Sequence, residues 1–335
     1  MKPMRGRTSL IATMLNEAES IEAWMQGIEQ QTVLPDEIVV VDGGSTDGTL
    51  AALNAWVAPV ALRIISAPGA SIARGRNIAI SKAAGEIVVV TDAGTIAQPE
   101  WIEHLLAAFE DPRTDVAVGF FVPRTASRWD AALAATTLPD SAEFAGGRFL
   151  PSSRSLAFRR AWLELGLRYP EWLDYCEDVV FDLALRRAGA NFRFVPEAVV
   201  EFRVRPTFAE FWKQYYRYAR GDGKAGLFPL RHAVRYATYV GLVLVVLRGR
   251  RLELLVMGLA GLAYLRAPVR RLRRRQAGTD PRTIGLTALL RMWGDLAKMV
   301  GYPVGIAWRL RHFGLGGYAG GWKRISPTLE QSHPE

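Results

Sequence analysis

The chain has 335 residues, and half of them are hydrophobic, which is enough to bury a core without disulfide bonds. Its single cysteine, Cys176, excludes an intramolecular disulfide, and four scattered histidines argue against a zinc site. The formal net charge of +9 favours an anionic partner: a phosphate ligand, a nucleic acid or an anionic lipid surface. The apolar run after the basic start covers only Leu10–Leu15, so we expect a first strand there and no secretory signal.

Up to about residue 225, short apolar runs alternate with helical patterns. Strands are predicted at residues 9–13, 37–41, 62–66, 87–91 and 116–122, and helices at 20–30, 47–56, 71–84 and 99–109. This alternation predicts an α/β fold with a mostly parallel central sheet and helices on both faces. Short strands and a helix near residues 177–187 follow, and we expect residues 1–225 to form one catalytic domain.

Polar residues follow the first two predicted strands, at the sheet edge where ligands of α/β proteins bind. The first strand ends in Thr13, Asn16 and Glu17, and the second ends in Asp42 and Gly44. A carboxylate there can accept hydrogen bonds from a ribose or a base, and a glycine lets the backbone approach a ligand. The alternative is a plain turn that caps the next helix.

The next two loops carry candidates for binding a diphosphate and a metal ion. Arg74, Arg76 and Asn77 lie at a predicted helix N-terminus, where the helix dipole and the guanidinium groups favour a phosphate. A solvated surface pair is the alternative for either arginine alone. Asp92 ends the fourth strand, and one carboxylate beside a diphosphate is the minimum for holding Mg²⁺ or Mn²⁺. Taken alone, Asp92 is more often a turn residue.

Four of these segments carry a family resemblance, and they are Thr13–Ile21, Pro35–Thr49, Ala73–Asn77 and Val90–Gly94. In order and spacing they resemble the family-2 glycosyltransferases of the GT-A fold, and the resemblance covers residues 8–220. It implies a nucleotide-diphosphate sugar as donor, with the nucleoside held by Thr13, Asp42 and either Asn16 or Glu17. It also implies that Arg76 lies near the diphosphate.

The same resemblance implies that Asp92 lies near a divalent metal ion, Mg²⁺ or Mn²⁺. The family often has a second acidic residue two positions later, where this chain has Gly94. Asp92 is therefore expected to be the only carboxylate ligand, or to bind the metal through water.

Glu177 and Asp178 open the predicted helix at residues 177–187. Acidic residues there stabilise the positive end of a helix, and that is the structural alternative. The functional interpretation is a general base, because an acceptor hydroxyl must lose its proton as it attacks an anomeric carbon. The pair resembles the Glu-Asp motif of the same family, whose aspartate is the base of an inverting displacement. This assigns the base to Asp178, with Glu177 assisting at the acceptor.

Gln214, Arg217 and Tyr218 have the Gln-x-x-Arg-aromatic spacing that resembles the acceptor and diphosphate motif of cellulose-synthase-like enzymes, with tyrosine in place of tryptophan. On a helix the three residues share one face. Arg217 or Arg220 is expected to neutralise a departing diphosphate. The alternative is an amphipathic interfacial helix rich in tyrosine and tryptophan.

The composition changes after Gly226, and residues 226–335 are expected to form a hydrophobic and basic helical region. The apolar runs 236–247 and 252–265 are each shorter than the roughly 20 residues that span a bilayer, and arginines separate them. Because Lys- and Arg-rich loops prefer the cytoplasm, we expect residues 232–310 to lie in or dip into the cytoplasmic face of the membrane. A soluble helical subdomain is the alternative.

The sequence thus predicts an inverting glycosyltransferase at the cytoplasmic membrane, with its catalytic domain facing the cytoplasm and a hydroxyl acceptor. A nucleotidyltransferase should show a Gly-rich first loop with a lysine, and residues 14–19 lack both. A nucleotide-sugar-binding module without catalysis is a further alternative. A nucleic-acid partner is not expected, because the excess positive charge lies mostly in the arginine clusters of residues 248–275, beside apolar runs.

Overall fold

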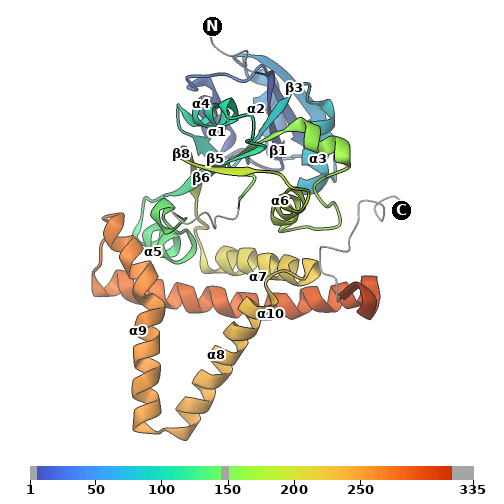
Figure 1. The fold of residues 1–335 in the computed structure, drawn as a ribbon. Helices are drawn as coiled ribbons and strands as arrows, with labels where there is room; N and C mark the ends of the chain where they lie inside the picture. The colour runs from blue at the N-terminus through green and yellow to red at the C-terminus, as the bar shows by residue number, and fades with distance from the viewer. Residues whose placement is uncertain (1–5, 145–150, 319–335) are drawn as a thin grey trace. The chain divides into compact units, whose positions relative to one another are not determined.

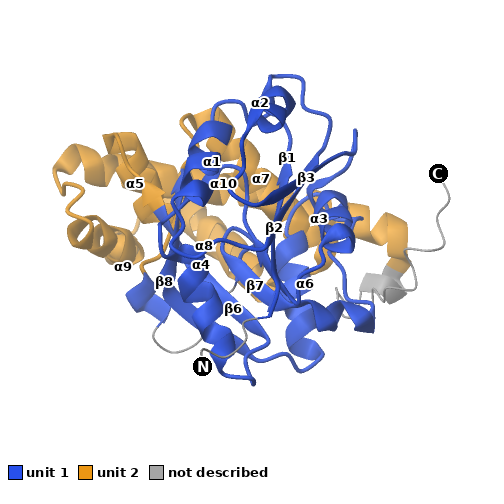
Figure 2. Ribbon diagram, turned by 90° about the horizontal axis from the view of Figure 1, so that it is seen from above, with its two compact units in different colours: residues 1–122, 141–203, 325–335 blue, residues 123–140, 204–324 orange. Residues whose placement is uncertain are grey.

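The computed structural model describes residues 6–144 and 151–318 (Figure 1). Contacts divide these residues into two compact units (Figure 2). Unit 1 comprises residues 6–122, 141–144 and 151–203, and unit 2 comprises residues 123–140 and 204–318.

Unit 1 contains a mixed sheet. In sheet order its described strands are β3 (Ala61–Ser66), β2 (Glu37–Asp42), β1 (Thr8–Met14), β4 (Ile87–Val90), β7 (Leu156–Arg159), β6 (Val116–Arg124), β8 (Phe192–Arg203) and β5 (Thr95–Ala97). Strands β1 to β4 pair in parallel. Strand β7 pairs antiparallel with β4 and β6, and β5 pairs antiparallel with β8. The predicted α/β class is confirmed, and the parallel pairing is confined to the N-terminal half of the sheet.

Helices cover both faces of this sheet. Successive strand residues point to opposite faces, so the apolar residues of each strand pack into two separate buried clusters. Leu10 and Val89 belong to one buried cluster, with residues of α1 (Ile21–Glu29), α2 (Thr49–Ala55) and α4 (Trp101–Ala107). Their neighbours Ile11 and Val90 belong to a second cluster, with residues of α3 (Ile72–Lys82) and α6 (Glu177–Arg187). Three short 3₁₀ segments complete the unit, η1 (Ala108–Glu110), η2 (Ser141–Phe144) and η3 (Arg160–Leu165).

Unit 2 is helical, and its described helices are α5 (Arg128–Thr137), α7 (Phe208–Ala225), α8 (Pro229–Arg248), α9 (Arg251–Arg274) and α10 (Pro281–Tyr318). Helices α7 and α10 pack with their backbones in contact. A Cβ atom added at Gly301 would collide with the carbonyl oxygen of Tyr216, and one added at Gly305 would collide with that of Arg220. Glycine at these two positions therefore permits the close packing.

Helices α8 and α9 form a hairpin whose tip is Gly249–Arg250 (Figure 1). They contain 20 and 24 residues, so each helix extends beyond the apolar run that the sequence analysis identified. The arginine-bearing ends remain helical, which lengthens each helix beyond its apolar run. Both helices are long and apolar enough to cross a membrane by length and composition.

Candidate active site

The carboxyl ends of β1 and β2 lie side by side, because the strands pair in parallel with Met14 opposite Asp42. Asp42 is fully buried, and its Oδ2 accepts hydrogen bonds from the N–H groups of Gly44 and Ser45, both at 3.0 Å. Gly44 has φ +99°, a conformation that side-chain-bearing residues rarely adopt. The other oxygen, Oδ1, is buried and has no hydrogen-bond partner among the described residues. It can therefore accept a hydrogen bond from a ligand.

Hydrogen bonds tie the loop after β1 to the loop after β2. The Asn16 N–H donates to Ser45 Oγ at 2.9 Å, and Asn16 Oδ1 accepts from the Thr46 N–H at 2.9 Å. The Glu17 N–H donates to Thr49 Oγ1 at 2.8 Å. Asn16 and Glu17 thus hold the two loops together at the sheet edge, and their contacts with a nucleoside stay predictions.

The start of helix α3 lies close to the sheet. A Cβ atom added at Gly75 would be only 2.8 Å from Thr13 Cγ2, so this position requires glycine. Arg74 is exposed, and its N–H donates to Ser71 Oγ at 3.2 Å, which caps the helix. Asn77 holds a loop, because its Nδ2 donates to the Tyr169 carbonyl at 2.9 Å and its Oδ1 accepts from the Tyr169 N–H at 3.0 Å. A role of Arg74 or Asn77 in donor binding stays a prediction.

Arg76 joins three parts of unit 1. Its side chain is buried, with Nη1 donating to Glu177 Oε1 at 2.6 Å and Nη2 donating to Asp92 Oδ1 at 2.7 Å. Helix α3 thereby links the end of β4 to the start of α6 and brings together three of the predicted site residues. Because both terminal nitrogens bond to carboxylates, Arg76 acts as a bridge here, and its contact with a diphosphate stays a prediction.

Glu177 and Asp178 occupy the first turn of α6, after Cys176, which has a left-handed backbone with φ 67°. Glu177 is buried, and burial and the neighbouring Asp178 raise its pKa to about 7 despite the guanidinium of Arg76. Asp178 is only half-buried, and its Oδ1 accepts from the Val179 N–H at 2.9 Å. Asp178 is therefore the carboxylate of the pair that an acceptor can reach.

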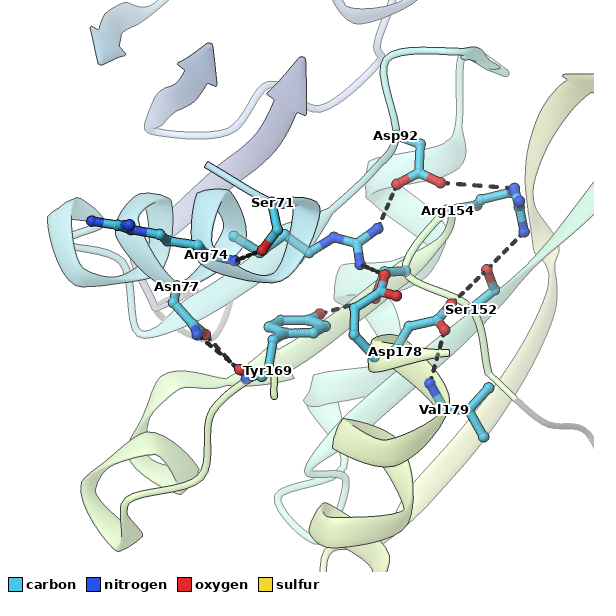
Figure 3. Close-up of polar contacts among 12 residues, drawn as sticks. Ser71, Arg74, Asn77, Asp92, Ser152, Arg154, Tyr169, Asp178 and Val179 are labelled. Carbon is cyan, nitrogen blue, oxygen red and sulfur yellow. Dashed lines mark hydrogen bonds and ion pairs between the residues drawn. The ribbon is translucent and has the colours of Figure 1, made fainter. Parts of the chain in front are cut away.

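Two residues that the sequence analysis did not select extend this chain of polar contacts (Figure 3). Ser152 Oγ donates to Asp178 Oδ2 at 3.4 Å, and Arg154 Nη1 donates to Ser152 Oγ at 3.1 Å. Arg154 Nε lies 3.8 Å from Asp92 Oδ2. Asp92 and Asp178 are thus connected through Ser152 and Arg154, whereas Arg76 connects Asp92 to Glu177, the neighbour of Asp178 in the chain.

Asp182 lies one helical turn after Asp178 and is buried, at 1% exposure. Burial raises its pKa well above the ordinary value, and the Asp178 carboxylate raises it further. Neither of its carboxyl oxygens has a hydrogen-bond partner among the described residues. Burial and the nearby Asp178 carboxylate thus both favour the protonated form of Asp182.

Asp92 fits a divalent metal ion as a single protein ligand. Its side chain is 25% exposed, and Oδ2 has Arg154 only at 3.8 Å, beyond hydrogen-bond distance. No cluster of three or more His, Cys, Asp or Glu residues that could hold a metal occurs in the described part of the chain. Mg²⁺ and related ions are commonly held by one or two carboxylates together with substrate phosphates and water. Asp92 Oδ2 satisfies that minimum.

Gln214 and Arg217 lie on α7 of unit 2. Gln214 Nε2 donates to the hydroxyl of Tyr218 at 3.0 Å, so these two residues share a helix face as their spacing predicts. The roles of Gln214 and Arg217 toward a diphosphate or an acceptor stay predictions.

Comparison with protein families identifies the class of protein. The family described as Glycosyl transferase family 2 matches residues 9–163, and Glycosyl transferase family group 2 matches residues 87–302. The second match covers well over half of the chain. The protein therefore belongs to the family-2 glycosyltransferases.

Individual relatives are more distant. The chain is 24% identical over 204 residues to the O-antigen chain rhamnosyltransferase RfbN of Salmonella typhimurium, a match that covers 57% of this chain and 65% of the relative. It is 25% identical over 116 residues to the cholesterol galactosyltransferase of Borreliella burgdorferi, covering 34% of this chain and 32% of the relative. In both cases the match spans less than two thirds of the relative's length.

A solved structure shares the fold. The mannosyltransferase PcManGT from Pyrobaculum calidifontis, in complex with GDP-Man and Mn²⁺, aligns with a TM-score of 0.53 and 21% identity. The alignment covers 92% of this chain and 88% of that chain. The predicted GT-A fold is thus confirmed.

Proposed function

We propose that this protein is an inverting hexosyltransferase that moves a sugar from a nucleotide-diphosphate sugar to a hydroxyl acceptor, with residues 1–225 as its catalytic region. The observation that carries the proposal is the Arg76 bridge, which holds Asp92 at 2.7 Å and Glu177 at 2.6 Å from its terminal nitrogens. It holds the metal-binding candidate Asp92 close to the start of α6, where the base candidate Asp178 follows Glu177. The similar mannosyltransferase was solved with GDP-Man and Mn²⁺, which supports the same kinds of ligand here.

Asp178 acts as the general base in this proposal. Its half-buried carboxylate removes the proton of the acceptor hydroxyl while the hydroxyl oxygen forms a bond to the anomeric carbon. The bond between that carbon and the donor diphosphate breaks at the same time, and the nucleoside diphosphate leaves with the bonding electrons. Attack from the face opposite the leaving group inverts the configuration. Glu177 stays paired with Arg76 and fixes the start of α6.

Asp42 binds the nucleoside of the donor, and Asp92 acts at its diphosphate. The unpaired Oδ1 of Asp42 accepts a hydrogen bond from the nucleoside, supported by Thr13 and the Asn16–Glu17 loop. Asp92 Oδ2 would hold Mg²⁺ or Mn²⁺, and such an ion supplies charge stabilisation for a departing diphosphate. The exposed Arg74 and the α7 residues Gln214 and Arg217 are further proposed diphosphate contacts.

We further propose that α8 and α9 hold the enzyme at the cytoplasmic membrane, through residues 232–310. In each helix only 6% of the apolar 18-residue segment is buried, so these side chains have no protein core to cover them. Arginines flank the apolar segments, and basic residues near membrane segments favour the cytoplasmic side and anionic lipids. The catalytic region then faces the cytoplasm.

A ligand screen tests donor binding. UDP, GDP, dTDP and their common sugar derivatives are added with Mn²⁺, and the melting temperature of the full-length protein is recorded. A ligand that binds only the native state raises Tm, by an amount that grows with its concentration. We expect one nucleoside diphosphate to raise Tm and Asp42→Asn to abolish that shift. No shift with any of these nucleotides would contradict the proposal.

Asp178→Asn tests the catalytic role. We expect turnover of the identified donor to fall about 10²–10⁴-fold, because the amide cannot accept the proton. The Tm shift with the nucleoside diphosphate should remain, since Asp178 is not assigned to the nucleotide. Normal turnover in this variant would remove Asp178 from the mechanism. Loss of turnover with retained binding would exclude a binding module without catalysis.

A further inference from the structure

Arg154 is held between two aromatic rings beside the carboxylates. Its guanidinium carbon lies 4.5 Å from the centre of the Phe202 ring and 5.5 Å from that of Phe121. Such cation–π contacts restrict a long side chain to few conformations. Arg154 is 20% exposed, whereas the Arg76 side chain is only 3% exposed. Of the two arginines beside these carboxylates, Arg154 is therefore the more exposed.

The contacts of Arg154 also define the direction of the hydrogen bonds around Asp178. Arg154 Nη1 donates to Ser152 Oγ at 3.1 Å, because a guanidinium has no acceptor. The Ser152 hydroxyl proton is then available for Asp178 Oδ2, at 3.4 Å. With the Val179 N–H donating to Oδ1, both oxygens of Asp178 are oriented.

The same guanidinium faces the proposed metal ligand. Its Nε lies 3.8 Å from Asp92 Oδ2, close enough for attraction and too far for a hydrogen bond. Three carboxyl groups, those of Asp92, Glu177 and Asp178, meet in this site, and Arg76 bonds directly to two of them. Arg154 supplies the second positive charge, on the side of Asp178.

We propose that Arg154 is a positioning residue of the transfer reaction, which orients the base Asp178 through Ser152 and holds Asp92 in the same frame. This rests on the function proposed above. A base must be held within a fraction of an ångström and a few tens of degrees of its productive geometry, so a residue that fixes its orientation acts on the reaction rate more than on substrate affinity.

The test uses four variants of the full-length enzyme: Arg154→Met, Arg154→Lys, Ser152→Ala and the double variant Arg154→Met/Ser152→Ala. The assay is hydrolysis of whichever probe the wild type turns over, UDP-glucose, GDP-mannose or dTDP-rhamnose, with Mn²⁺. We expect Arg154→Met to lower kcat about 10–100-fold with KM for the donor within about threefold. Arg154→Lys should recover part of the lost kcat. The double variant should be little worse than the worse single variant, because the two residues act in series.

The control is Arg159→Met, at the last residue of strand β7, which begins two residues after Arg154. Arg159 also stacks on an aromatic ring, 5.3 Å from the centre of Phe109, but it donates to the Thr114 carbonyl and contacts none of the three carboxylates. We expect this variant to lower Tm and to keep kcat.

The outcomes separate this inference from the proposed function. The role of Arg154 would be overturned if Arg154→Met kept the wild-type kcat. It would also be overturned if the kcat losses of the two single variants multiplied in the double variant. Either result would leave the enzyme's activity established. A wild type that hydrolyses none of the three donors, and whose Tm no nucleoside diphosphate raises, would remove the proposed function and this inference with it. If Arg154→Met does not fold, Arg154→Lys and Ser152→Ala decide the question through the same split between kcat and KM.

Discussion

Unit 1 buries its apolar side chains, whereas the α8–α9 hairpin of unit 2 exposes many of its own. In unit 1 the strand residues Val40 and Val89 are fully buried, and helices cover both faces of the sheet. In the hairpin Leu247 is 77% exposed and Leu262 is 69% exposed. Both regions are rich in leucine and valine, so composition alone does not distinguish them. Unit 1 covers its apolar strands with its own helices, whereas the apolar side chains of the hairpin are largely uncovered among the described residues.

The charged groups reinforce this contrast. Unit 1 buries Arg76 between two carboxylates, and a buried charge of this kind is tolerated only when it is paired. The arginines of the hairpin, Arg248, Arg250 and Arg251, lie at its tip and are exposed. The buried charges of unit 1 thus hold a site together, whereas the charged groups at the tip of the hairpin lie at the surface.

The largest expected effect comes from charging the hairpin. Leu255, Leu259 and Leu262 share one face of α9 and are 61%, 58% and 69% exposed. Replacing all three by aspartate should move the protein from the membrane fraction to the soluble fraction, because each charge costs about 2.5–3.5 kcal/mol at the centre of a bilayer. Ultracentrifugation of lysates measures the change. The control is Val57→Asp with Leu165→Asp, two exposed positions of unit 1. Unchanged fractionation of the α9 variant would remove the contrast between the two regions.

The second effect comes from breaking the buried pair of unit 1. Arg76→Met should lower the free energy of unfolding by about 3–5 kcal/mol, because Glu177 would remain buried without its cation. Addition of Glu177→Gln should restore part of the loss. Thermal unfolding of both variants measures it. The exposed pair of Arg113 and Asp111 gives the control, since Arg113→Met should leave Tm unchanged. Equal effects of Arg76→Met and Arg113→Met would show that burial does not matter here.

The smallest effect concerns the buried acid Asp182. Its folded pKa lies above its unfolded pKa, so the unfolded state ionises first as pH rises and stability falls from about pH 4 upward. Asp182→Asn removes this ionisation while keeping the shape. The variant should become more stable relative to the wild type as pH rises from 5 to 8. Melting temperatures at both pH values measure the change. A constant difference between the two proteins would contradict the raised pKa.

The sequence predicts unit 1 well because its signals are local. Apolar runs followed by polar turn residues identify β1, β2, β3 and β4 to within one or two residues, and α6 begins at Glu177 as expected. The sequence also selects Asp92, Arg76 and Glu177, which the structure joins by direct ion pairs. Each of these residues follows a strand or begins a helix, where short patterns are informative.

Other features depend on distant contacts. Arg154 stands out only because Phe121 and Phe202, from β6 and β8, lie next to it, and no local spacing relates these three positions. Asn77 looks like a ligand-binding residue in sequence, but its side chain bonds to the backbone of Tyr169, 92 residues later. Helices α8 and α9 extend beyond their apolar runs because their ends carry arginines, which have good helix propensity despite their charge.

The glycine contacts between α7 and α10 have a mechanical consequence. With Gly301 and Gly305 set against the carbonyl groups of Tyr216 and Arg220, neither helix has room to slide or rotate past the other. Any displacement of α10 must therefore carry α7 along with it. The face that bears Gln214 and Tyr218 takes its orientation from a helix that begins at Pro281, well further along the chain.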